Sequence, residues 1–297
     1  MTTVLESTLP DSLVGRSVLA VPASKDVFAL AAARFPDAAW QTDPQEAAAR
    51  STPVRGSGGA RFRGVQTAVE PVHPEIALEP GLVLTGPFSC HARDAQALGL
   101  LAVEHDLYVF PEPQVTAHIG ELRAWAIIAA KHSWGALLEP DGEVLRPDPE
   151  ENIALRLFSP DPQPLDVVLE RVRQALPSAR VREKESGEQA IVATLEYDGS
   201  VLLRAGRAAT AAPTALKTVD WRDYGPHVYT VEWLPPADLA AGEPAPLYVI
   251  ARQRAALVIA RAMTLLQRSL TGTVLDDDDV IVTEQDLADR VLGRRRV

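Results

Sequence analysis

Hydrophobic and polar residues alternate along this chain in short segments that predict strands and helices in turn. Apolar runs at 17–22 and 153–158 predict strands, and apolar residues at helical spacing follow each of them. The same periodicity predicts two long helices, at 121–138 and 252–267. Shorter helices are expected at 24–35, 91–103 and 165–176 and from 284 onward. Further strands are expected at 38–42, 62–69, 81–84, 107–110, 179–183, 190–197, 201–205, 227–233 and 279–283.

The order of these elements repeats, and this predicts an internal duplication. One series runs from the strand HDLYV at His105 through the helix LRAWAIIAA to the turn GEVL at Gly142. The second runs from HVYTV at His227 through RAALVIARA to GTVL at Gly272. Each half has the order β-α-β-β-β-β-α-β, so we predict an internally duplicated α+β protein of two-layer α/β sandwich units, with mostly antiparallel sheets and helices on one face. The predicted parts are a polar leader at 1–15, a first repeat at 16–150 and a second repeat at 151–297.

The two long helices differ on the face that this alignment matches. Arginines recur every seven residues at 254–268, which predicts a solvated stripe, whereas the aligned positions of the first helix are apolar. A helix without a polar face has to be covered on both sides, by the other half of the chain, by a second copy in a homodimer or by a separate protein. The candidate interface residues are Leu122, Trp125, Ala129 and Ala136.

Composition and charge narrow the class of protein. The chain has 297 residues, of which 46% are hydrophobic, so it can bury a substantial core. Its 40 acidic and 29 basic residues give a net charge of −11, which argues against binding to nucleic acids or anionic membranes, since phosphates require a positive surface. With one cysteine, no secretory signal at the N-terminus and no apolar run of about 20 residues, we expect a cytoplasmic protein.

One segment offers a nucleophile. Cys90 is followed by His91 and lies near His105 in the sequence, and a catalytic cysteine requires a base or a helix N-terminus to lower its pKa. No cysteine-hydrolase signature surrounds it, and a free cysteine is commonly a buried structural residue. We therefore assign no catalytic residue and keep these three as candidates. His105 and His227 begin matched strands, and we expect them to share a structural role.

The chain also contains an acidic run, formed by Asp276, Asp277, Asp278 and Asp279. Clustered carboxylates are suitable ligands for Ca²⁺ or Mg²⁺, but the spacing of an EF-hand is absent, and no histidine has metal-ligand spacing. We expect an acidic turn, with no metal and no cofactor. The glycine-rich stretch 56–59 predicts a surface loop.

These patterns favour a non-enzymatic protein-interaction module built from a tandem α+β repeat, such as an adaptor, a chaperone-like protein or an immunity-type protein. Its partner would be another protein or a second copy of the chain. The alternative is a hydrolase or transferase with a cleft between the halves that uses Cys90, His91 and His105.

Overall fold

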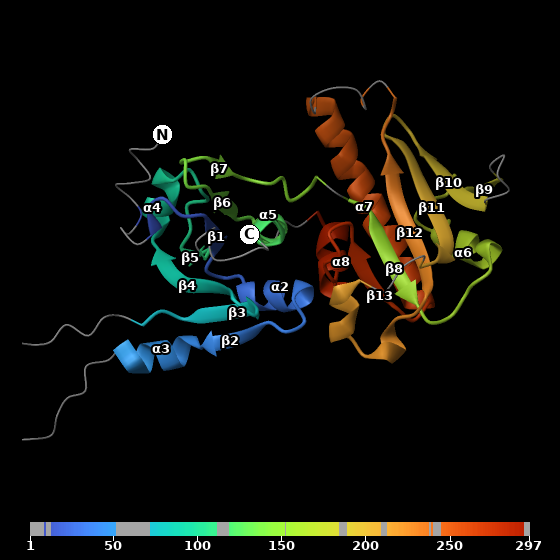
Figure 1. Cartoon of the computed structure of the whole chain (residues 1–297). Coiled ribbons are helices and arrows are strands. Elements are labelled where there is room, and N and C mark those ends of the chain that lie inside the picture. Colours follow the sequence, from blue (N-terminus) through green and yellow to red (C-terminus); the bar gives the residue numbers. More distant parts are fainter. Residues whose placement is uncertain are drawn as a thin grey trace, which may run out of the picture. The chain divides into compact units, whose positions relative to one another are not determined.

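The chain forms two compact units, Met1–Pro149 and Glu150–Val297, each with its own antiparallel sheet (Figure 1). The protein therefore has a mixed α+β architecture. The computed structural model describes residues 9, 13–51, 72–111, 119–151, 153–183, 189–208, 213–237, 239 and 245–293.

The first unit is built on a sheet with the strand order β2-β3-β4-β5-β1-β6-β7. Its strands are β1 (Val18–Pro22), β2 (Ala39–Thr42), β3 (Glu75–Glu79), β4 (Leu82–Cys90), β5 (His105–Val109), β6 (Ala136–Leu138) and β7 (Val144–Leu145). Its helices are α2 (Val27–Arg34), α3 (Pro44–Ser51), α4 (Ala92–Ala97) and α5 (Ile119–Ser133).

Both faces of this sheet are covered. On one face α2 and α5 bury Val27 and Trp125 against Leu19 and other residues of the sheet. On the opposite face Ala95 of α4 packs with Ala20. The prediction of two layers, with helices on one face only, therefore does not describe this unit, because the connection between β4 and β5 forms a cover of its own.

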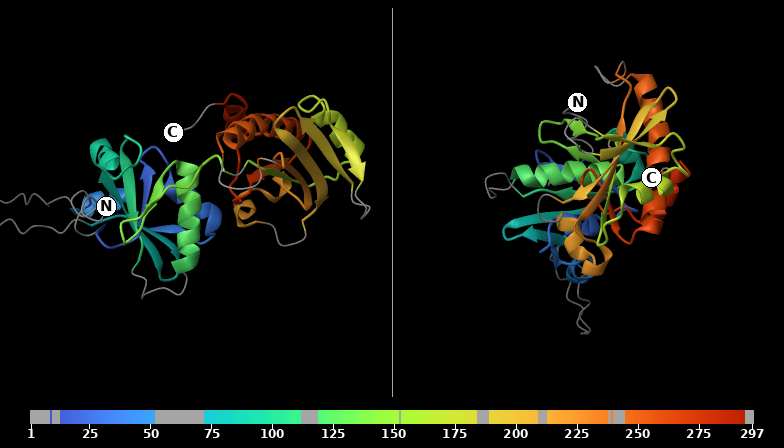
Figure 2. Two further views of the ribbon diagram at one scale, coloured as in Figure 1. Left: turned by 90° about the horizontal axis from the view of Figure 1, so that it is seen from above. Right: turned by 90° about the vertical axis from the view of Figure 1, so that its right-hand side faces the viewer.

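The second unit, coloured from yellow-green to red in Figure 2, has the strand order β13-β8-β12-β11-β10-β9. Its strands are β8 (Leu155–Ser159), β9 (Arg180–Glu183), β10 (Gln189–Leu195), β11 (Gly199–Arg207), β12 (His227–Leu234) and β13 (Thr273–Asp276). Its helices are α6 (Leu165–Val172), the 3₁₀ helices η2 (Thr214–Thr218) and η3 (Trp221–Asp223), α7 (Pro246–Ser269) and α8 (Glu284–Val291).

The sheet of the second unit also packs on both faces, but unequally. One face is buried under Val168 of α6, Ile259 of α7 and Leu287 of α8. On the other face the described cover is small, with Leu216 of η2 packed against Phe158 and a few neighbours. The arginine stripe predicted for α7 is confirmed, since its three members are exposed: Arg254, Arg261 and Arg268.

The two sheets share one strand order. Counted from the first strand of each unit, both read 2-3-4-5-1-6, and the first unit adds β7 at its edge. A tight contact also recurs beside the first strand of each unit. A Cβ atom on Gly135 would lie 2.2 Å from the carbonyl oxygen of Ala20, and one on Gly272 would lie 2.5 Å from that of Phe158. Only glycine fits either place without a shift of the backbone.

These contacts correct the alignment made from the sequence. Gly135 and Gly272 each precede the strand that pairs with the first strand of its unit, whereas Gly142 lies one turn later, between β6 and β7. The predicted long helix at 121–138 stops at Ser133 for the same reason, because the backbone must pass close to Ala20 before β6 begins.

Several other expectations are also corrected. In the predicted polar leader, Leu9 and Leu13 are buried in the core of the first unit. The N-cap of α2 is Asp26, whose carboxylate accepts a hydrogen bond from the Ala29 N–H at 3.1 Å, rather than Ser24. The final strand, β13, precedes the predicted segment 279–283. Helix α3 and strand β3 were not anticipated, and the predicted loop 56–59 and strand 62–69 lie outside the described residues.

Candidate functional site

The four residues predicted to form an interface are core residues of the first unit. Leu122, Trp125 and Ala129 lie on the buried face of α5, and Ala136 lies in β6 rather than in the helix. None of the four is more than 2% exposed. They pack against the sheet of their own unit and present no surface to a partner.

A slip of one residue in the sequence alignment of the two long helices explains why these core residues were predicted to lie at an interface. When the helices are aligned on their buried positions, Leu122 corresponds to Ala255 and Ala129 to Ala262, all of which are buried. The sequence comparison had instead matched Leu122 with Arg254. One residue turns a helix by about 100°, which is enough to exchange a buried face for an exposed one.

The structure brings two of the three catalytic candidates together, but without activating the thiol. Cys90 of β4 lies opposite His105 of β5, and both are buried. The pKa of the Cys90 thiol is raised by burial and by the charge of Asp94, so the thiol stays protonated at neutral pH. His105 Nδ1 contacts the Val103 carbonyl oxygen at 2.8 Å, whereas His91 is exposed, 3.9 Å from Glu104.

His105 and His227 do not share a structural role. In β5 the residues on the His105 side, such as Leu107, pack in the core under α4. In β12 the residues on the His227 side, such as Tyr229, pack in the core under α7. The two histidines therefore point to opposite faces of their sheets.

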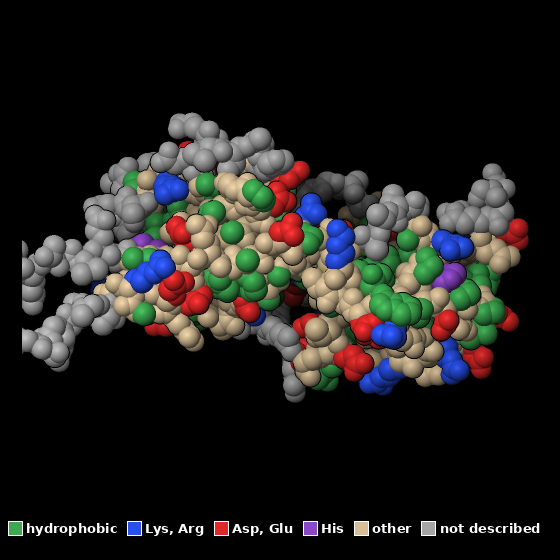
Figure 3. Space-filling view, turned by 60° about the horizontal axis from the view of Figure 1, so that its bottom comes forward, with side chains coloured by type: hydrophobic (Ala, Val, Ile, Leu, Met, Phe, Trp, Pro, Cys, Tyr) green, Lys and Arg blue, Asp and Glu red, His purple; other side chains and the backbone are tan. Residues whose placement is uncertain are grey.

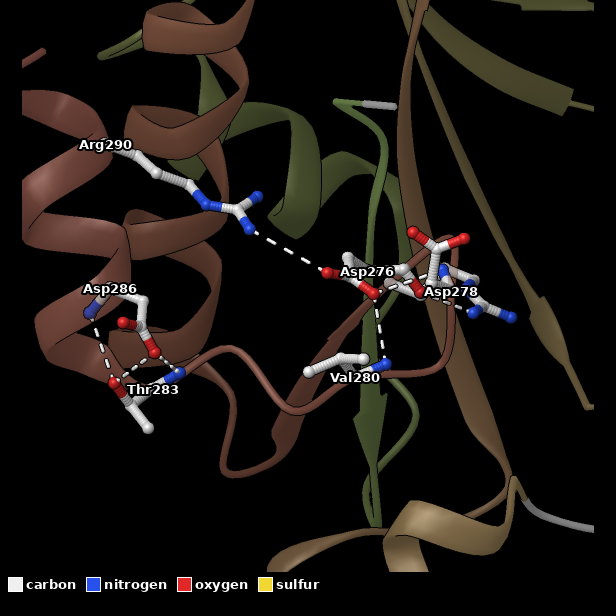
Figure 4. Close-up of polar contacts among 7 residues, drawn as sticks. Asp276, Asp278, Val280, Thr283, Asp286 and Arg290 are labelled. Atoms are coloured by element: carbon white, nitrogen blue, oxygen red, sulfur yellow. Dashed lines mark hydrogen bonds and ion pairs between the residues drawn. The ribbon is translucent and has the colours of Figure 1, made fainter. Parts of the chain in front are cut away.

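The four-aspartate run forms a turn, and the protein itself engages the carboxylate of Asp276 within it (Figure 4). Asp276 Oδ1 accepts hydrogen bonds from the backbone N–H groups of Asp278 and Val280, at 3.1 and 3.0 Å. Its other oxygen lies 3.8 Å from Arg290 of α8. Asp279 adopts a φ of 62° and pairs with Arg156 at 2.7 Å. Asp276 therefore caps the turn, and Asp279 is the ion-pair partner of Arg156.

A hollow in the second unit provides the geometry of a binding site. It has a volume of about 630 Å³ and lies where β8 and β11 end and β12 begins. Trp221 is 70% exposed there, and the Arg222 guanidinium lies 4.8 Å from the centre of its ring. Figure 3 shows hydrophobic side chains gathering on the second unit among scattered charged groups. The hollow is lined by Phe158, Pro160, Ala208, Trp221, Arg222, Tyr224, Gly225 and Pro226.

Local contacts fix the segment that carries these aromatic residues. Gly225 lies so close to the end of β8 that a Cβ atom there would be 2.4 Å from Pro160 Cα. The Thr273 hydroxyl donates a hydrogen bond to the Asp223 carbonyl oxygen at 2.8 Å, and the Ala208 N–H donates one to Pro226 at the same distance. The wall of the hollow is therefore tied to three strands of the sheet.

The sequence contains a signal for this hollow that lies outside the helix and strand periodicity. The stretch WRDYGP at 221–226 lies between two predicted strands and combines two aromatic residues, an arginine, a glycine and a proline. Aromatic residues in a loop carried by a rigid sheet are typical of binding surfaces.

The second unit is thus a mixed α+β unit with a hollow, lined in part by aromatic side chains, at one end of its sheet. No family model, curated protein or solved structure matches this chain. Among the described helices, none has the length and the apolar character needed to cross a membrane.

Proposed function

We propose that this chain is a non-catalytic protein-interaction module, built from two copies of one α+β plan, that binds a segment of a partner protein in the hollow of its second unit. The observation that carries this proposal is the exposed Trp221 at the hollow of about 630 Å³. Trp, Tyr and Arg are the residues that dominate binding energy at protein interfaces, and Trp221, Arg222 and Tyr224 all line this hollow.

The chemistry of the lining favours binding over catalysis. Apart from Arg222 and Tyr224, the described residues around the hollow carry aromatic, proline, alanine or glycine side chains. The pKa of the Cys90 thiol, which belongs to the other unit, is raised rather than lowered. A hydrolase or transferase would require a base or an activated nucleophile at its cleft.

The shared strand order and the two close-approach glycines support the duplication. The turns that follow the last equivalent strands add a third match. The Gly142 N–H donates to the Glu139 carbonyl oxygen and has a φ of 88°, and the Asp279 N–H donates to Asp276 in the same way with a φ of 62°. In this alignment the acidic run corresponds to a simple turn of the first unit.

A selection of peptides displayed on phage against the full chain tests the proposal. We expect enriched peptides whose binding weakens by about 30-fold in Trp221→Ala, equivalent to about 2 kcal/mol at an interface hot spot. Tyr197→Asn is the matched control, because Tyr197 is also an exposed aromatic residue, 83% exposed, but lies in the hairpin at the opposite end of β11. Asparagine tolerates the φ of 68° found there.

Both variants should unfold at the temperature of the parent chain. Enriched peptides that bind Trp221→Ala and the parent chain equally would remove the hollow as the binding site. Hydrolysis or modification of the selected peptides by the chain would contradict a non-catalytic module.

A further inference from the structure

Three arginines lie in one row across the sheet of the second unit, on the face that also carries Phe158. Thr230 of β12 pairs with Arg156 of β8 on one side and with Arg204 of β11 on the other. Arg204 lies beside Ala190 of β10, because the preceding residues Leu203 and Ile191 are partners. Ala190 in turn pairs with Arg182 of β9, the edge strand. Partners on neighbouring strands share a face, so the three arginines alternate with small residues across five strands.

The arginines of this row reach the surface to different degrees, and Ala190, which lies between two of them, is buried. The side chain of Arg204 is 41% exposed and that of Arg156 is 25% exposed, and Arg182 is exposed on the edge strand. Two of the arginines are held in place by acidic neighbours, Arg204 by Glu232 at 2.7 Å and Arg156 by Asp279 at 2.7 Å. Arg156 also donates a hydrogen bond to the Asp276 carbonyl oxygen at 2.6 Å, and the Nε atoms of both arginines are buried. A guanidinium has five N–H donors, so its terminal nitrogens keep N–H groups beyond these contacts.

The first unit shows that the fold does not require charge at these positions. If Gly135 is superposed on Gly272, the residues that they approach, Ala20 and Phe158, correspond, and Arg156 therefore corresponds to Val18. The pairing between neighbouring strands then matches Thr230 with Val109 and Arg204 with Thr85. Val18 and Val109 are buried in a core that Leu9 and Leu13 help to form. The second unit thus has partly exposed arginines where the first has a buried valine and a partly buried threonine, in a chain whose net charge is −11.

The spacing of the row matches one kind of ligand. Successive arginines are two strands apart, which corresponds to about 9–10 Å at about 4.8 Å for each strand. A polyproline II helix repeats every three residues with a rise of about 3.1 Å, so every third side chain lies on one side, about 9.3 Å from the next. Carboxylates at every third position of such a segment would each reach one arginine.

We propose that this face of the second unit binds an acidic, proline-rich segment of a partner protein in the polyproline II conformation, with a carboxylate at every third residue. This inference rests on the proposed function, because the hollow lies beside the row: Phe158 follows Arg156 by two residues on the same face. Hollows walled by aromatic side chains are the usual docking sites for proline in this conformation, and Trp221 and Tyr224 supply such a wall.

The probe is a fluorescein-labelled peptide of Glu-Pro-Pro repeated four times, titrated into the full chain and followed by fluorescence anisotropy. We expect binding that weakens on the order of tenfold when Gln replaces Glu, and that falls as salt increases. A peptide of the same composition with its glutamates in one block should bind more weakly than the regular peptide. Arg182→Gln should weaken binding about two- to fivefold, the effect of one exposed ion pair. Arg268→Gln, an exposed arginine on α7, is the matched control and should have no effect.

The outcomes separate this inference from the proposed function. Equal binding of the Glu and Gln peptides, or of the regular and blocked peptides, would overturn the inference, and so would displacement of the probe by a short oligonucleotide of equal charge. Peptides selected on phage that require Trp221 but ignore Arg182 would overturn the acidic ligand and leave the interaction module in place. Binding of the probe that requires Arg182 but not Trp221 would confirm the row and remove the hollow from the proposed function.

Discussion

At the scale of single residues, the environment of Cys90 decides how its thiol reacts. Its position next to His91 and near His105 in the sequence suggested a nucleophile, but burial and the charge of Asp94 raise the pKa of the thiol. We predict that a thiol reagent at neutral pH labels Cys90 in the folded chain on the order of tenfold more slowly than in the chain unfolded in denaturant. Labelling at the same rate in both states, measured by mass spectrometry, would restore it as a reactive thiol.

Asp106 of β5 is a second residue whose environment perturbs its ionisation. Burial, and to a lesser extent the charge of Glu104, raise the pKa of its carboxyl, and nearby His105 opposes this shift. The folded state therefore binds the proton of this carboxyl more tightly than the unfolded state does. Below the ordinary aspartate pKa of about 3.9 the group costs no stability, and stability is lost as the pH rises from that value to the raised pKa.

We therefore predict that Asp106→Asn raises the melting temperature at pH 7 and leaves it nearly unchanged at pH 3. Thermal unfolding followed by circular dichroism at both values measures this. Asp37→Asn, at an exposed position, serves as the control. A gain of equal size at both pH values would show that the effect does not come from ionisation.

At the scale of elements, most helices and strands follow from local pattern, whereas their exact register does not. The hairpin of β10 and β11 forms from the two strands predicted there, with Leu195 and Gly199 as the last pair and a three-residue turn at 196–198 between them. The faces of β5 and β12 were misaligned, since a slip of one residue in a strand exchanges its two sides. Only the contacts across the sheet reveal which side of each strand is buried.

The end of α5 depends on a tertiary contact that has a direct test. We predict that Gly135→Ala destabilises the chain by about 1–3 kcal/mol, because its Cβ would overlap the Ala20 carbonyl oxygen. Gly120→Ala is the control, since Gly120 lies exposed in the same helix with no atom within 4 Å of a Cβ. That change should stabilise the chain by up to about 1 kcal/mol. Urea unfolding measures both, and a neutral Gly135→Ala would contradict the close packing.

At the scale of the whole molecule, each unit has its own sheet and its own hydrophobic core. Two cores that share no strand are expected to unfold as separate cooperative units. We predict two transitions in differential scanning calorimetry, with Gly135→Ala lowering one of them and Gly272→Ala, which affects the contact with Phe158, lowering the other. A single transition that both variants shift equally would mean that the units unfold together.

The candidate site also emerges only at this scale. Phe158, Ala208 and Trp221 are far apart in the sequence and meet because β8, β11 and β12 are neighbours in the sheet. The arginine row arises in the same way, from strands whose order in the sheet differs from their order in the chain. The row has no local pattern that the sequence alone could reveal, whereas the aromatic residues Trp221 and Tyr224 are a local clue to the hollow.

The sequence by itself determined the mixed α+β class, the position of most elements, the arginine stripe of α7 and the acidic balance of the chain, because these depend on composition and on contacts between residues a few positions apart. The tertiary structure decided which faces are buried, which glycines approach a neighbouring strand closely and where the aromatic and basic groups come together. Those properties depend on pairing between distant strands, and there a shift of one residue exchanges core for surface. The helix of the first unit that looked uncovered is buried against its own sheet, and the hollow lined by Trp221 and Tyr224 lies in the second unit.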